Sequence, residues 1–200
     1  MKLRSDLAII SEWIKPGSRV LDLGCGDGAL LRYLQDNREV TGYGLEIDDD
    51  DVVRCIESGV NVIQTDLDAD LSDFRENSFD YVIMSQTLQA VHYPDKLLQE
   101  MLRLGREGIV TFPNFAHWSN RLQLAFGGQM PMSRALPNPW YSTPNIHLCT
   151  VQDFEQLCGE RDINILERTM VNHAHRNSIG NHILPNLFGK IALYRFKHSA

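Results

Sequence analysis

The chain has 200 residues, 43% of them hydrophobic and 22% charged, and a formal net charge of −7 at pH 7. This length suits one domain, residues 1–200, with a full hydrophobic core. An acidic chain without a cluster of Lys and Arg is a poor candidate for binding nucleic acid, so we expect no nucleic-acid partner.

The sequence does not indicate membrane insertion or export either. No stretch approaches the ~18 apolar residues of a membrane span. The opening MKLRSDLAIISEWI lacks the continuous apolar core of a signal peptide. The four cysteines show no C-x-x-C spacing. We therefore expect neither a disulfide framework nor a zinc site, and we predict a cytoplasmic protein.

The first predicted element is a helix, because Leu3, Leu7, Ile10 and Ile14 recur at helical spacing before Pro16-Gly17. Strands and helices then alternate. The predicted strands are 18–24, 39–47, 61–66, 78–85, 107–113, 163–171 and 190–197. The predicted helices are 28–36, 48–59, 94–105 and 150–158. Short, almost wholly apolar strands separated by helices indicate an α/β fold with a parallel sheet covered on both faces.

The composition and the periodicity of the sequence change at about residues 114–148. This stretch contains several prolines and the pair Gly127-Gly128, and it shows little periodicity outside WSNRLQLAF. It also carries Trp118, Trp140 and Tyr141. Because a linker rarely holds so many aromatic residues, we expect an insertion that covers part of the domain.

The segment VLDLGCGDG, residues 20–28, follows the first strand with a glycine-rich turn. A dinucleotide fingerprint reads G-x-G-x-x-G and holds a pyrophosphate at a helix N-terminus. Here Gly24, Gly26 and Gly28 read G-x-G-x-G. Asp22 would place negative charge beside this loop, which disfavours a pyrophosphate and favours a ligand with an ammonium or sulfonium cation.

Two more carboxylates follow the next strands. Glu46 ends the second strand, 18 residues after Gly28, where a carboxylate can accept the hydroxyls of a ribose. Asp66 closes the third strand and could meet an adenine amino group. Ligands of open α/β sheets bind at the carboxyl ends of the strands. Asp22, Glu46 and Asp66 together therefore predict an S-adenosylmethionine site.

The pattern VLDLGCGDG…GYGLEID…VIQTDLD…SFDYVIMSQTLQ resembles class I methyltransferases. Over its whole length the chain resembles the MetW family of methionine-biosynthesis proteins, through GLEID, SQTLQAV, TFPNFAHW and WYSTPNIHLCT. This resemblance implies a three-layer Rossmann-like fold whose seven-stranded, mostly parallel sheet has its last strand antiparallel. It also implies S-adenosylmethionine as cofactor and homoserine O-acyltransferase as partner.

The resemblance further implies which residues bind the cofactor, grouped by the part of the molecule that they face. They are Asp22, Gly24, Cys25 and Gly26 for the methionine tail, Glu46 for the ribose, Ile47, Asp66 and Leu67 for the adenine, and Ser85 and Gln86 for the reacting methyl group. Cys25 could instead be a reactive thiol near a helix N-terminus. We expect rather that its small side chain fits the loop.

Catalytic residues cannot be assigned from the sequence. His92 and His147 are the candidates for a general base, although His92 could lie in a surface loop and His147 could anchor the chain before Thr150. Tyr141 could contact a substrate, but we expect Trp140 and Tyr141 to be core or lid aromatics rather than substrate contacts.

No metal site is predicted. The acidic run 48–51 is expected to cap a helix, since carboxylates there oppose the helix dipole. Thr150 is expected to cap the helix at 150–158. His173, His175 and His182 could chelate a metal, but no Cys or carboxylate at ligand spacing accompanies them.

Two functions fit the sequence. One is a MetW-type protein that binds S-adenosylmethionine and works with or on homoserine O-acyltransferase. The other is a conventional small-molecule methyltransferase with residues 114–148 as the acceptor lid. Methyl transfer requires chiefly that the protein bind and align the cofactor, so the sequence leaves open whether the cofactor is a substrate or a signal. A nicotinamide oxidoreductase is disfavoured by the glycine spacing.

Overall fold

The computed structural model describes residues 3–69, 71–171 and 183–199. Within these residues the strands form one seven-stranded sheet in the order β3-β2-β1-β4-β5-β7-β6. The strands are β1 (Arg19–Leu23), β2 (Thr41–Glu46), β3 (Val62–Gln64), β4 (Phe79–Ser85), β5 (Gly105–Pro113), β6 (Ile163–Val171) and β7 (Ile191–His198). β7 runs antiparallel to β5 and β6, and the other neighbours are parallel. This confirms the predicted sheet.

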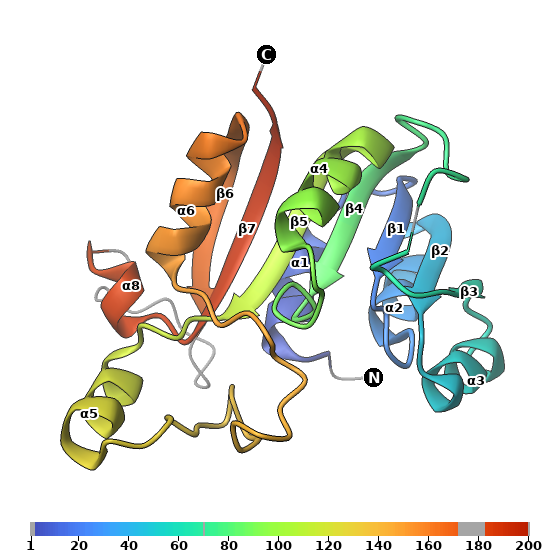
Figure 1. The fold of residues 1–200 in the computed structure, drawn as a ribbon. Helices are drawn as coiled ribbons and strands as arrows, with labels where there is room; N and C mark the ends of the chain where they lie inside the picture. Colours follow the sequence, from blue (N-terminus) through green and yellow to red (C-terminus); the bar gives the residue numbers. More distant parts are fainter. Residues whose placement is uncertain (1–2, 70, 172–182, 200) are drawn as a thin grey trace.

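Helices cover both faces of the sheet (Figure 1). The helices of the described residues are α1 (Ser5–Trp13), α2 (Ala29–Arg38), α3 (Asp49–Glu57), α4 (Pro94–Leu104), α5 (Trp118–Gly127), α6 (Val151–Glu160) and the short α8 (Pro185–Phe188), and of these α5 lies apart from the sheet. Buried side chains of α4 and α6 pack in one hydrophobic cluster, and those of α1, α2 and α3 in another. The molecule therefore has the three layers that the sequence predicts.

Strand periodicity assigns each buried side chain to one of the two layers. Along β4, Val82 and Met84 belong to the cluster of α4 and α6, whereas Tyr81 and Ile83 belong to the cluster of α1 and α2. All four side chains are at most 3% exposed. Because successive residues of a strand point to opposite faces, a sheet buried on both sides needs such continuous apolar runs.

Two helix starts form as predicted. The Asp48 carboxylate caps α3 by accepting hydrogen bonds from the backbone N–H groups of Asp50 and Asp51. Thr150 caps α6 in a capping box. Its hydroxyl accepts from the backbone N–H of Asp153, and the Asp153 carboxylate accepts from the backbone N–H of Thr150. The acidic run at 48–51 thus has a structural explanation.

Some boundaries differ from the predictions. β3 ends at Gln64, so Asp66 lies in the turn beyond the strand and does not close it. The first helix begins at Ser5 and leaves Leu3 outside. The short helix α8 was not predicted. None of the helices in the described part of the chain is long and apolar enough to cross a membrane.

The strand order places a topological switch point between β1 and β4. From β1 the chain continues to β2 and β3 on one side of the sheet, and β4 and β5 extend the other side. The carboxyl ends of these strands leave a crevice at such a point, where ligands of open α/β sheets bind.

Candidate functional site

A pocket of about 450 Å³ opens at the carboxyl ends of β1, β2, β3 and β4. This volume is within the usual range for small-molecule sites, roughly 300–1,000 Å³. The predicted cofactor residues that line the pocket are Gly24, Glu46, Ile47, Asp66, Leu67 and Gln86. Asp22, Cys25, Gly26 and Ser85 are not among its lining residues.

The glycine loop requires glycine at its first position. Gly24 has φ +70°, and a Cβ atom there would lie 2.6 Å from Thr87 Oγ1. The backbone N–H groups of Gly24 and Cys25 both donate to the Leu45 carbonyl, at 2.8 and 3.1 Å. Any side chain at position 24 would therefore separate β1 from the segment after β4. Gly26, at φ +55°, faces open space, since its nearest neighbour would be 4.0 Å away.

Asp22 is a buried carboxyl with an unused acceptor. Its side chain lies near the end of β1 and the residue is 2% exposed. Within the described residues, Asp22 Oδ1 has no hydrogen-bond partner. Burial raises the pKa of Asp22 to about 7, and Glu46 also raises it, while Arg4 acts in the opposite direction. A cation bound beside Asp22 would favour the ionised form.

Glu46 links the glycine loop to the start of α3. Its Oε2 accepts a hydrogen bond from the backbone N–H of Gly26 at 2.8 Å. Its Oε1 accepts from the backbone N–H groups of Ile47 and Asp48, at 2.8 and 3.1 Å. A carboxylate has about four acceptor positions, so roughly one remains, on Oε2. Two ribose hydroxyls could both bind Glu46 only if one backbone donor gave way.

The end of the pocket predicted for adenine is formed by Ile47 and the turn after β3. Ile47 is 60% exposed, so its side chain is available to a flat ring. Asp66 Oδ1 accepts from the backbone N–H of Asp68, which fixes this turn. Leu67 packs against the core beneath.

The two residues predicted to face the methyl group contact the N-terminal segment. Gln86 has φ +61°, in the left-handed region, and its Nε2 donates to Asp6 Oδ2 at 3.0 Å. Ser85 Oγ accepts from Arg4 Nη2 at 2.8 Å. Non-glycine residues in this backbone region concentrate at functional sites, where the surrounding structure holds them in place.

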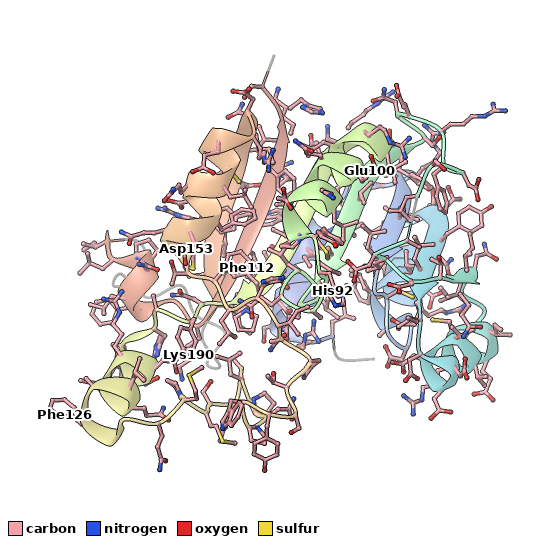
Figure 2. The ribbon with its side chains drawn as sticks, viewed as in Figure 1. His92, Glu100, Phe112, Phe126, Asp153 and Lys190 are labelled. Carbon is pink, nitrogen blue, oxygen red and sulfur yellow. The ribbon has the colours of Figure 1, made fainter. Side chains whose placement is uncertain are left out.

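His92 and His147 come together beside the turn after β3. The His92 ring Nδ1 lies 2.7 Å from Asp68 Oδ2, and its backbone N–H donates to Asp68 Oδ1 (Figure 2). His147 Nε2 lies 3.2 Å from the His92 carbonyl oxygen. Burial opposes the charge on Asp68, but the bonds from His92 outweigh it, so the pKa of Asp68 is lowered. These contacts hold His92 against Asp68 and His147 against His92, and they give no support to a general-base role at the methyl group.

Cys25 belongs to the packing beneath the loop. Its Sγ lies 3.8 Å from Cys55 Sγ, and a Cβ atom at Gly44 would collide with the Cys25 side chain. Burial raises the pKa of the Cys25 thiol far above its usual value, and Asp22 raises it further. The geometry therefore favours the small-residue interpretation over a reactive thiolate.

The aromatic pair of the insertion lies on the surface. Trp140 and Tyr141 are 72% and 74% exposed and pack edge to face with each other. Of the two predicted roles, core or lid, the core role is wrong and the lid role stays a prediction; Tyr141 does not line the pocket described above. The insertion reaches the pocket instead through Pro144 and Asn145.

Several residues that line the pocket were not predicted from the sequence. Asp68 and Thr87 line the pocket but were not predicted. The repeated acidic spacing in TDLD was a signal for Asp68, whereas nothing local marked Thr87. His173, His175 and His182 lie outside the described residues. Among the residues that the structure describes, no three metal-ligating side chains gather.

Comparisons with known proteins identify the family and the fold. The family model described as methionine biosynthesis protein MetW matches residues 4–196. The bifunctional methionine biosynthesis protein MetXA/MetW of Rhodopirellula baltica is 36% identical over 205 residues, which cover 97% of this chain and 33% of the relative. The chain thus spans about a third of that relative's length.

Solved structures show the same fold. An S-adenosylmethionine-dependent methyltransferase from Mesorhizobium loti superposes with a TM-score of 0.70 at 16% identity, covering 98% of each chain. One from Aquifex aeolicus superposes with a TM-score of 0.63 at 15% identity, covering 96% of this chain and 88% of the other. The architecture is therefore that of class I methyltransferases.

Proposed function

The chain belongs to the MetW family of methionine biosynthesis proteins, and on that premise we propose that it binds S-adenosylmethionine and works with or on homoserine O-acyltransferase. The observation that carries cofactor binding is the buried, unpartnered oxygen of Asp22 beside the glycine loop. An isolated buried carboxylate is costly, and a bound cation removes that cost.

The residues present fit S-adenosylmethionine. Asp22 would meet the cationic methionine tail, Gly24 and Gly26 would leave room for it, Glu46 would hold the ribose, and Asp66 would meet the adenine. When bound, this cofactor supplies an electrophilic methyl group on a positively charged sulfur. The chain's own contribution is to orient the ligand and to neutralise its charge.

The partner proposal is supported by the relative's name and by the surface of the insertion. That relative is named for MetXA and MetW in one chain. In this chain α5 buries only Asn120, while Leu122, Leu124 and Phe126 are 46%, 47% and 86% exposed. A helix shorter than ~12–15 residues is marginally stable by itself in water, so α5 gains from packing against another protein. We assign homoserine O-acyltransferase to this surface (Figure 2).

Copurification tests the partner proposal. A tagged chain is expected to retain homoserine O-acyltransferase from the native cell, and mixing the purified proteins should change the acylation rate. Adding S-adenosylmethionine should then alter that rate further. If the two proteins fail to copurify at cellular concentrations and the rate does not change, the partnership is excluded.

One observation favours a second candidate, a conventional small-molecule methyltransferase. Pro144 and Asn145 line the cofactor pocket, as a lid over an acceptor would. This function predicts that the purified chain forms S-adenosylhomocysteine when supplied with S-adenosylmethionine and a cell-extract metabolite. A broad screen of extract fractions without any turnover would eliminate it.

A further inference from the structure

A second pocket, of about 180 Å³, adjoins the cofactor pocket. Gln86 lines both, so the two spaces meet at the residue that was predicted to face the methyl group. Three cationic side chains line the second pocket, and Asp6 is the carboxylate among its lining residues. The cations are Arg4, Arg134 and Lys190. Its apolar wall includes Ala135, Val171 and Ile191.

The backbone around each cation is fixed. Arg134 lies in a turn closed by reciprocal hydrogen bonds between Ser133 and Leu136, and the Leu136 side chain is buried. Lys190 precedes β7, and its carbonyl accepts from the Asn114 backbone N–H at 2.8 Å (Figure 2). Arg4 donates to Asp6 Oδ1 at 2.7 Å and to Ser85. The three cationic residues of the pocket therefore come from three separate segments of the chain, each held by hydrogen bonds of its own.

The charge balance of this pocket is opposite to that of the chain. Asp6 is 1% exposed, and its two oxygens are engaged by Arg4 and Gln86. No carboxylate in the described parts of the chain pairs with Arg134. The sequence between Glu107 and Asp153 contains no Asp or Glu, although the net charge of the chain is −7. The second pocket is thus lined by more positive than negative residues, although the chain as a whole is acidic.

We infer that this second pocket binds a small carboxylic acid beside the cofactor. A guanidinium fork matches a carboxylate in plane and spacing, and the apolar wall suits a short carbon chain. The position beside the cofactor rests on the proposed function, whereas acid binding itself does not. The competing occupant is the carboxylate of the cofactor's own methionine tail, which Arg4 could reach.

Calorimetric titration with succinate at fixed ionic strength tests the inference, with neutral succinamide as the matched probe. Binding of succinate and not of succinamide is expected. Arg134→Gln should weaken succinate binding about tenfold, the loss of a charge-assisted bond. Arg75→Gln, which removes the same charge from an exposed site outside both pockets, should leave succinate binding unchanged. Neither substitution should change the affinity for S-adenosylmethionine.

Three results would overturn the inference: equal binding of succinate and succinamide, no binding of succinate, or binding of inorganic phosphate with succinate excluded. Loss of S-adenosylmethionine affinity in Arg134→Gln without an effect on succinate would assign the pocket to the cofactor's tail. If the parent protein binds succinate but not S-adenosylmethionine, the acid pocket stands and the proposed function fails.

Discussion

The end of the sheet and the insertion at 114–148 are built in opposite ways. At the sheet end, Asp22 is 2% exposed and the glycine loop is tied to β2 by backbone hydrogen bonds. In the insertion, every residue from 121 to 130 is exposed, and α5 lies apart from the layers of the sheet (Figure 1). The sheet end is thus packed and hydrogen-bonded within this chain, whereas most of α5 has no packing surface among the described residues. The proposed cofactor site and the proposed partner surface therefore lie in separate parts of the fold, and substitutions can probe each one alone.

The largest expected effect is at Asp22. Its pKa is raised to about 7, so the folded chain keeps a proton that the unfolded chain releases near pH 4. Stability from this group is therefore fully present below pH ~4 and is lost as the pH rises to ~7, by about 4 kcal/mol. Urea unfolding of the ligand-free protein across this range should show the loss, and Asp22→Asn should remove it. An unchanged pH profile in the variant would contradict the assignment.

The next effect concerns the glycine loop. Gly24→Ala should lower the free energy of unfolding by about 2–4 kcal/mol, because the new Cβ strains a positive φ and meets Thr87. Gly127→Ala, with nothing within 4 Å of its Cβ, is the control in the insertion and should cost almost nothing. Chemical denaturation measures both variants. If the two variants lost the same free energy of unfolding, the two regions would not differ in packing as described.

Substitutions on α5 should change partner binding and not the stability of the chain. The double variant Leu122→Ser and Phe126→Ser should leave the unfolding transition of the isolated chain nearly unchanged, since both side chains are already exposed. Its affinity for homoserine O-acyltransferase should fall by about 2 kcal/mol or more, as for buried interface anchors. Ile56→Ser on α3, 64% exposed, is the control. Full affinity in the double variant would remove α5 from the interface.

The smallest effect is expected at the histidine pair. The side chain of His92 is 70% exposed, and surface ion pairs contribute about 0–1 kcal/mol. His92→Gln should therefore change stability by less than about 1 kcal/mol. The variant should also form S-adenosylhomocysteine at nearly the rate of the parent protein at every pH between 6 and 8. A large loss of rate would restore His92 as a general base.

Local sequence signals predicted the sheet well. Continuous apolar runs and intervening helical patterns identified each strand, and the three glycines predicted the turn after β1, in which Gly24 has a positive φ. Side-chain partners far along the chain left no local signal. The bond from Gln86 to Asp6 joins residues that are 80 positions apart. The exposure of Tyr141 was missed because an aromatic residue is ordinarily assigned to a core, and its surroundings depend on the whole fold.

Titration of the purified chain with S-adenosylmethionine and with 5′-methylthioadenosine, which lacks the amino-acid tail and the positive sulfur, tests the central claim most directly. The account predicts that the parent protein binds S-adenosylmethionine at least about tenfold more tightly, and that Asp22→Asn removes most of this preference. Equal affinities for the two compounds, or tighter binding of NADH than of either, would contradict it.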